Sequence, residues 1–169
     1  MTVEDRLRDL GIELPPAAAP VASYVPVVVA GGLAFVAGQV PLQDGKPMAT
    51  GRLGAELTTD EGAFWARRCA LQALAALQAE LGTLDRIRRI AKLTVWVASV
   101  ESFAEQPTVA NGASDCLVEV FGEAGKHARA AVAAPVLPLN APVEVEVIAE
   151  IVPPEPPPAV RAVPGSAPP

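Results

Sequence analysis

The sequence predicts a single-domain α/β (α+β) protein in which two helices cover one face of a mixed sheet. Its 169 residues are enough for one domain with one core. Apolar patterns typical of strands and helices follow one another in the order β-β-(β)-α-β-α-β-β. Hydrophobic residues make up 51% of the chain but aromatic residues only 4%, so alanine and valine must fill most of the core.

Composition divides the chain into three parts. Residues 1–20 contain a short amphipathic helix, predicted at Thr2–Leu10, and a proline-rich arm. Residues 21–152 form the main domain. Residues 153–169 are dominated by proline, alanine and serine. We expect this tail to be disordered or polyproline-like, because it can bury little and proline donates no backbone hydrogen bond.

The first segment of the main domain has two interpretations. Val21–Val40 is nearly uncharged and long enough to cross a bilayer. It is interrupted by Gly31-Gly32, which stands between Val27–Val29 and Leu33–Val36. Paired glycines predict a two-residue hairpin turn, because both central residues of such a turn need positive φ. We therefore predict two strands rather than a membrane span.

Two helices are predicted from their end signals. Thr58 and Glu61 have the spacing of a capping box, and the helix that they begin should run to Leu81 before Gly82. A second helix is predicted at Asn111–Phe121. Further strands are predicted at Ile90–Val97, His127–Ala134 and Val143–Ile151, and a short one within Gln39–Gly54.

Several predicted strands are apolar on both sides, as in Ala130-Ala131-Val132-Ala133. A strand that is buried on one side only should alternate between apolar and polar residues. Two helices on one face leave the other face bare, so we expect other subunits to cover it and predict a homo-oligomer. The alternative is that small alanine and valine side chains are tolerated on a wet face.

Several function classes are disfavoured. A net charge of −6 and a pI near 4.8 argue against a nucleic-acid surface. The chain has no phosphate-binding glycine loop, no Cys/His metal spacing and no Ser-His-Asp set, so neither a cofactor nor a metal is expected. Cys69 and Cys116 are interpreted as reduced core thiols, with a disulfide as the alternative. The charged N-terminus lacks the apolar stretch of a signal peptide, so we expect a cytoplasmic protein.

Arg129 is the first candidate site residue. It lies in the predicted strand His127–Ala134, which is otherwise almost free of polar side chains. A guanidinium among methyl groups is costly unless an anion meets it, and its planar fork suits a carboxylate. That anion is either a ligand or a partner within the protein. For the latter, Glu144 and Glu146 on the following predicted strand are the candidates, and the sequence favours neither alternative.

The remaining candidates have ordinary structural explanations beside the functional one. Glu144 and Glu146 share one side of their strand, where solvated carboxylates are the default and a partner for water or a substrate proton is the functional alternative. Tyr24 is either a packing residue or a site residue, and Asn111 is a helix N-cap by default. Gly38 marks either a bend or a point of close approach. Trp65 and Trp96 are both interpreted as core residues.

Three segments together resemble the Rid family, the YjgF-like group also called endoribonuclease L-PSP. They are Val36-Ala37-Gly38-Gln39-Val40-Pro41, the run Arg129-Ala130-Ala131-Val132 with Leu137-Pro138, and Val143-Glu144-Val145-Glu146-Val147-Ile148-Ala149. The resemblance covers about residues 21–151. The N-terminal helix is similar to that of a subgroup with an extended N-terminus.

The resemblance implies a chorismate-mutase-like fold and a homotrimer with clefts between subunits. It also implies hydrolysis of reactive enamines and imines, such as 2-aminoacrylate, to a 2-keto acid and ammonia without a cofactor. By position, Arg129 matches the arginine that holds the substrate carboxylate and Glu144 the acid that positions water. Tyr24 and Asn111 match cleft residues, and Gly38 matches a backbone contact. Arg129 and Glu144 are the implied catalytic residues.

The chain departs from the family pattern at three positions. Ala37 stands where well-studied members have serine, Ala131 where they have cysteine, and His127 where proline is frequent. These changes remove polar or reactive groups and keep the arginine. The sequence therefore leaves open a non-catalytic module that binds small carboxylates on the same trimer. A ribonuclease is disfavoured by the acidic charge and the single histidine.

Overall fold

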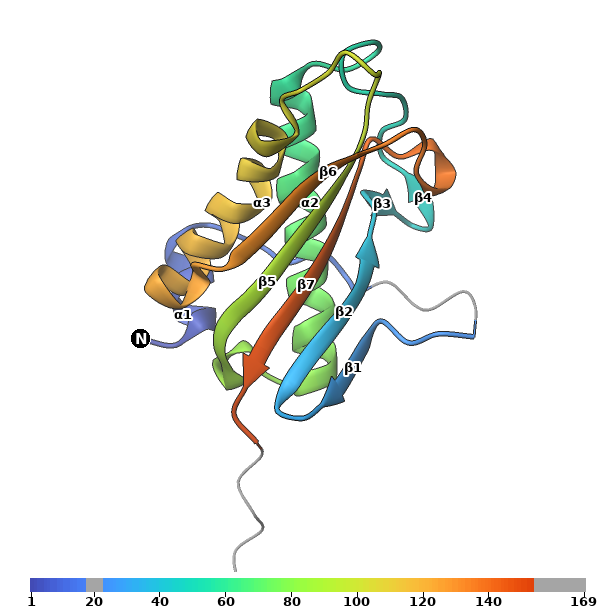
Figure 1. Cartoon of the computed structure of the whole chain (residues 1–169). Helices are drawn as coiled ribbons and strands as arrows, with labels where there is room; N and C mark the ends of the chain where they lie inside the picture. Colours follow the sequence, from blue (N-terminus) through green and yellow to red (C-terminus); the bar gives the residue numbers. More distant parts are fainter. Residues whose placement is uncertain (18–22, 154–169) are drawn as a thin grey trace, which may run out of the picture.

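A computed structural model describes residues 1–17 and 23–153, which form one layer of strands against one layer of helices (Figure 1). Five strands in this part of the chain make one sheet, in the spatial order β1 (Val27–Ala30), β2 (Leu33–Gln39), β7 (Val143–Ile151), β5 (Ile87–Ala98) and β6 (Ala128–Ala134). β5 and β6 are parallel and the other neighbours are antiparallel. The predicted mixed sheet in an α+β domain is confirmed.

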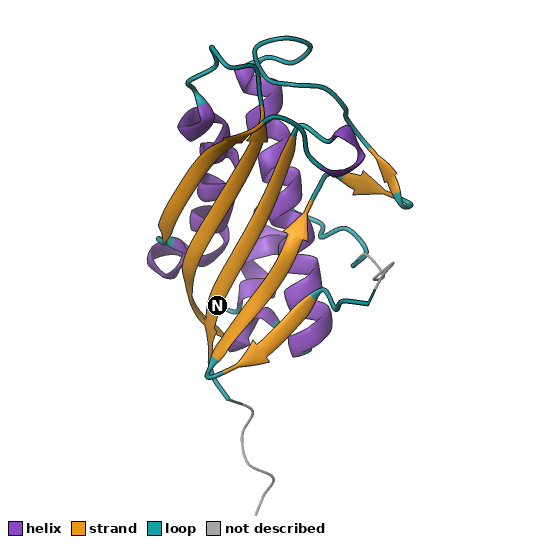
Figure 2. Cartoon of the chain, turned by 45° about the vertical axis from the view of Figure 1, so that its right-hand side comes forward, coloured by secondary structure: helices purple, strands orange, loops and turns teal. Residues whose placement is uncertain are grey.

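Both long helices lie on the same face of this sheet. α2 (Thr59–Leu81) and α3 (Gln106–Phe121) are packed side by side, and Figure 2 shows them behind the strands. The short α1 (Val3–Asp9) contacts α3 at the outside of the helix layer. The opposite face of the sheet carries no helix among the described residues, as the sequence predicted.

The glycine-centred hairpin is confirmed. β1 and β2 pair antiparallel from Val27 opposite Val36 to Ala30 opposite Leu33. Gly31 and Gly32 have φ of 59° and 78°, values that glycine adopts without strain. No helix in the described part of the chain is long and apolar enough to span a membrane. The segment after β2 forms two short strands, β3 (Leu42–Gln43) and β4 (Lys46–Pro47), where one was expected.

The sequence predicted the start of one long helix correctly and that of the other incorrectly. Thr58 and Glu61 form the predicted capping box at the start of α2, and Thr2 caps α1 in the same way through Asp5. The predicted start of α3 at Asn111 is wrong, because the helix begins five residues earlier. Glu105 makes no side-chain capping bond there, and a proline occupies the first turn, where its missing N–H costs nothing.

The core fills the space between α2, α3 and the inner side of the sheet. The central strands supply alternate aliphatic side chains, and α2 approaches them closely because it presents small residues. The fully buried members include Leu93, Val95 and Val97 of β5, Val143, Val145 and Val147 of β7, and Ala66, Ala70 and Ala73 of α2. This arrangement agrees with the prediction that alanine and valine fill the core.

The other side of the sheet, which we call the open face, bears Val28, Phe35, Trp96 and Val132 together with Glu144 and Glu146. Strand pairing places these side chains on one side, since Trp96 is opposite both Glu144 and Val132, and Phe35 is opposite Val28. Val28 is 50% exposed, Phe35 40% and Trp96 37%. The prediction that Trp96 is a core residue is therefore wrong for the single chain, whereas Trp65 does pack against the core.

The described residues end at position 153 and leave out positions 18–22. The predicted proline-rich tail beyond position 153 lies outside the described residues, and so does the end of the proline-rich arm.

Candidate functional site

Arg129 projects from an edge strand toward a helix. Its partner in the β5–β6 ladder is Leu93, which is buried under the helix layer, so the two side chains leave the sheet on the same side. β6 is the last strand of the sheet, and α3 runs beside it (Figure 1). Arg129 is exposed at this edge. The prediction that its guanidinium is buried among methyl groups is wrong, because an edge strand has only one neighbour.

Two side chains of α3 hold the guanidinium. Its Nη1 donates hydrogen bonds to Asn111 Oδ1 at 2.8 Å and to Ser114 Oγ at 3.0 Å. Asn111 and Ser114 are three residues apart on the helix, which places them on the same face. The guanidinium makes no further hydrogen bond within the described part of the chain, so Nε and Nη2 remain available. These two groups lie on one edge of the planar guanidinium, where they can donate two parallel hydrogen bonds to a carboxylate.

The alternative ion pair with Glu144 or Glu146 is wrong. β5 lies between β6 and β7, so the two glutamates are not on the neighbouring strand. They also belong to the open face, whereas Arg129 points to the helix side. Arg129 takes part in none of the ion pairs formed among the described residues. The structure thus brings Asn111 to Arg129 and separates Glu144 from it.

Ser114 and His127 complete this edge of the molecule, which we call the Arg129 corner (Arg129, Asn111, Ser114 and His127). His127 Nε2 lies 3.1 Å from Ser114 Oγ, and its Nδ1 lies 2.6 Å from the carbonyl oxygen of Gly125. A carbonyl can only accept, so Nδ1 carries the proton and Nε2 accepts the serine hydroxyl. Burial, followed by the charge of Arg129, lowers the pKa of His127, against the opposing effect of the bond to Gly125.

Ser114 is a residue of this corner that the sequence did not indicate. The only indication in the sequence is that Ser114 follows Asn111 by three residues. That spacing places the two side chains on one helix face only if the helix begins before both of them. With the helix placed at Asn111, Ser114 looked like part of its first turn.

Glu144 occupies a different environment on the open face. Its carboxylate lies against the backbone of Gly38, where a Cβ would overlap it. With any other residue at position 38, the Glu144 carboxylate would have to shift from this position. Burial, followed by the charge of Glu146, raises the pKa of Glu144 above its ordinary value. Trp96 Nε1 donates a long hydrogen bond of 3.5 Å to Glu146.

Tyr24 lies farthest from Arg129 in the sheet order. It precedes β1, the edge strand opposite β6, and its side chain is 51% exposed. Four strand spacings separate the two edges, a distance of about 19 Å. Within one chain, the five residues implied by the family resemblance therefore fall into three places: Arg129 with Asn111, Glu144 with Gly38, and Tyr24 alone.

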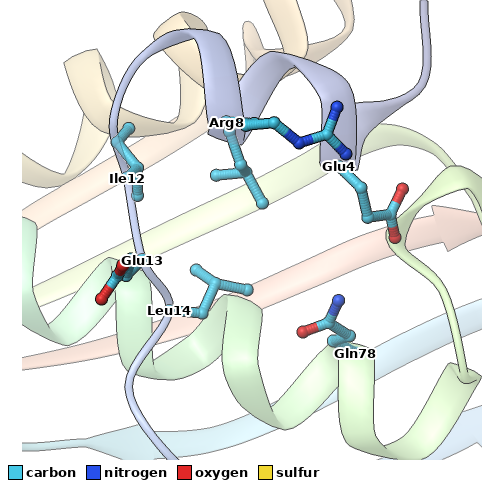
Figure 3. Close-up of a pocket in the computed structure, with 7 residues that line it drawn as sticks. Glu4, Arg8, Ile12, Glu13, Leu14 and Gln78 are labelled. Atoms are coloured by element: carbon cyan, nitrogen blue, oxygen red, sulfur yellow. The ribbon is translucent and has the colours of Figure 1, made fainter.

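A shallow groove of about 340 Å³ lies elsewhere, between α1, the segment after it and α2 (Figure 3). Both apolar and polar side chains line it: Glu4, Leu7, Arg8, Ile12, Glu13, Leu14 and Gln78. None of the predicted site residues belongs to this groove.

Both cysteines are free thiols in the core, as predicted, and the disulfide alternative is wrong. Burial raises the pKa of Cys69 strongly and that of Cys116 to about 11, so neither is a ready nucleophile. Within the described ranges, His, Cys, Asp and Glu side chains form no group of three that could hold a metal ion.

Comparison with known proteins identifies relatives over most of the chain. Residues 4–151 match the family model described as "YjgF/chorismate mutase-like, putative endoribonuclease". Protein TCP17 of Trypanosoma cruzi is 51% identical over 150 residues, which are 88% of this chain and 94% of that protein. The family match begins inside α1, so the N-terminal helix is included in it.

Two solved structures share the fold closely. The protein Atu1372 of Agrobacterium tumefaciens, of unknown function, is 45% identical with a TM-score of 0.82, over 89% of this chain and 92% of that one. A "putative endoribonuclease" of Shewanella oneidensis is 40% identical with a TM-score of 0.85, over 89% of this chain and all of that one. The resemblance stated from the sequence is thereby confirmed, and the chain belongs to the YjgF/chorismate mutase-like family.

Proposed function

We propose that this protein hydrolyses small enamines or imines that carry a carboxylate, such as 2-aminoacrylate, to a 2-keto acid and ammonia. The single observation that carries the proposal is the unoccupied edge of the Arg129 guanidinium. Asn111 and Ser114 orient the group through Nη1 only, and no carboxylate of the described residues neutralises it. An oriented cation without a counter-ion is an anchor for a ligand anion.

The site forms where copies of the chain meet, in the homotrimer that the family resemblance implies. Glu144 and Arg129 leave opposite sides of the sheet, so one chain cannot bring them together, whereas two chains can. The open face supplies the contact surface, because it exposes Phe35 and Trp96 beside Glu144. A patch of large apolar side chains next to a half-buried carboxylate is typical of a protein interface.

The proposed hydrolysis requires only two tasks of the protein. An iminium carbon is already electrophilic, so the site needs to hold the substrate carboxylate and to place a water molecule beside that carbon. Arg129 performs the first task, and Glu144 of a neighbouring copy performs the second. Positioning of this kind is worth several kcal/mol of the barrier, roughly 7–11 at most.

A second candidate function is a non-catalytic module that binds small carboxylates. The observation that favours it is the distance of Glu144 from Arg129 within one chain. Under this alternative the Arg129 corner alone binds a 2-keto acid, and no turnover accompanies binding.

The test is the rate of keto-acid formation from 2-aminoacrylate generated in situ, above the spontaneous rate. Arg129→Ala should lower kcat/KM by about 10²-fold or more, because the loss of an ion-pair anchor costs about 3 kcal/mol. Arg88→Ala is the matched control, since this arginine pairs with Glu150 at the surface of the same sheet. Equal rates for wild type and Arg129→Ala would end the proposal. Calorimetric binding of pyruvate without turnover would support the binding module.

A further inference from the structure

Nη1 of Arg129 is held at two points by α3. This nitrogen carries two N–H groups, and its two acceptors are Asn111 Oδ1 at 2.8 Å and Ser114 Oγ at 3.0 Å. With one acceptor the planar group could pivot about a single hydrogen bond, whereas two acceptors fix its plane and its direction. The free edge, formed by Nε and Nη2, lies on the far side of the guanidinium from Ser114. A carboxylate bound there touches neither Ser114 nor His127.

We propose that His127 is a positioning residue for this anchor, because it holds Ser114 in the rotamer that accepts from Nη1. The inference rests on the proposed function, since it assigns a further residue to the carboxylate anchor of that same site. His127 acts on the ligand only through Ser114 and Arg129, by turning the free edge of the guanidinium in one direction.

Ser114 needs such a partner because its side chain has alternatives. A serine within a helix can occupy more than one staggered rotamer, and its hydroxyl can donate to the carbonyl four residues earlier. In this structure Oγ lies 3.1 Å from Nε2 of His127 instead. Nδ1 of the ring donates to the carbonyl of Gly125 at 2.6 Å, so Nε2 of the neutral ring can only accept. The single proton of the serine hydroxyl is thereby directed to His127, and the lone pairs of Oγ are left for Arg129.

The imidazole is itself held in place. His127 lies between the short 3-10 helix η2 (Gly122–Gly125) and β6. Gly125 is buried, and its backbone lies so close to α3 that a Cβ at this position would overlap the carbonyl of Leu117. The acceptor for Nδ1 is therefore fixed against the same helix that holds Nη1. Burial lowers the pKa of His127, so the ring is neutral near pH 7 and Nε2 is free to accept.

The motion of the guanidinium tests this role without any ligand. NMR of the arginine side chains measures how fast Nη1 and Nη2 exchange by rotation about the Nε–Cζ bond, and the spectrum of Arg129→Lys identifies the signals of Arg129. For Ser114→Ala and His127→Leu we expect rotation to be about 10-fold faster, as for the loss of a hydrogen bond to a charged group. His127→Gln offers an oxygen in place of Nε2 and should restore slow rotation.

Affinity for pyruvate, measured by calorimetry, gives the second readout. His127→Leu and Ser114→Ala should each raise Kd by about 10-fold for the same reason. In the hydrolysis assay both should raise KM and leave kcat nearly unchanged, because neither side chain reaches the reacting atoms. His127→Gln should recover most of the lost affinity. Lys126→Gln is the control and should match the wild type, since Lys126 is exposed and engaged with Glu123 at 2.8 Å.

The outcomes separate the positioning role from the proposed function. Wild-type rotation and affinity in both His127→Leu and Ser114→Ala would overturn the positioning role and leave the proposed function standing. Fast rotation in His127→Leu that His127→Gln does not slow would assign the effect to packing of the ring, and would also overturn it. Rotation that depends on His127 as expected, in a protein that does not turn over 2-aminoacrylate, would support the positioning role and remove the proposed hydrolysis.

Discussion

The Arg129 corner and the open face both contain polar side chains, but these side chains interact with one another in different ways. In the Arg129 corner the side chains bond to one another across β6 and α3, all within one chain. On the open face Glu144 and Glu146 repel each other, and the large apolar side chains around them face solvent. The first region is preorganised in the single chain, whereas the second has the character of a surface that a partner covers.

This contrast explains why the implied site residues are scattered. A site made by one chain would collect them on one side of the sheet. Arg129 points toward the helix layer and Glu144 toward the open face, an arrangement that fits the proposal that each chain supplies a different half to two neighbouring sites.

Disruption of the open face should give the largest effect. Phe35→Glu places a charge in the proposed contact surface, so the oligomer should dissociate to monomers and lose imine hydrolysis. Light scattering coupled to size-exclusion chromatography measures the mass. Phe64→Glu is the matched control, because this phenylalanine is also exposed but lies on α2, in the helix layer. Dissociation by both variants, or by neither, would remove the distinction between the two faces.

A smaller effect is expected from Glu144→Gln on stability. The raised pKa means that the folded chain binds this proton more tightly than the unfolded chain does. Stability therefore falls as pH rises from the ordinary value of 4.5 through the raised pKa, and the ionised carboxylate destabilises the separate chain at neutral pH.

In the monomeric Phe35→Glu background, Glu144→Gln should thus raise Tm at pH 7 by a few degrees or less and leave it unchanged below pH 4. In the assembled protein the gain should shrink or reverse, because Arg129 of a neighbour then stabilises the ionised form. Thermal unfolding of the four proteins checks this prediction. An equal gain in both backgrounds would mean that assembly brings no cation to Glu144.

Local signals in the sequence were enough for most of the elements. The paired glycines fixed the β1–β2 hairpin, and the capping box at Thr58 fixed the start of α2. The start of α3 was missed because Glu105 makes no capping bond, so the only end signals were a proline and the later Asn111. Such patterns involve only a few neighbouring residues. They therefore cannot predict a helix start that is determined by tertiary packing.

The geometry of the candidate site could not be predicted from the sequence to the same extent as the helices and strands. Arg129 was recognisable by its apolar surroundings in the sequence, but its partners depend on β6 pairing in parallel with β5 instead of lying beside β7. That choice brings together residues far apart along the chain, and no local pattern encodes it. The same choice separates Arg129 from Glu144, and it brings Ser114 into contact with both Arg129 and His127.

The most direct test of a site shared between copies is complementation. Arg129→Ala and Glu144→Gln are each purified, unfolded, mixed in equal amounts and refolded together, and imine hydrolysis is measured against each variant refolded alone. With random assembly, one contact in four joins an intact Arg129 to an intact Glu144, so about a quarter of the wild-type activity should return. A mixture no more active than its separate components would contradict the shared site.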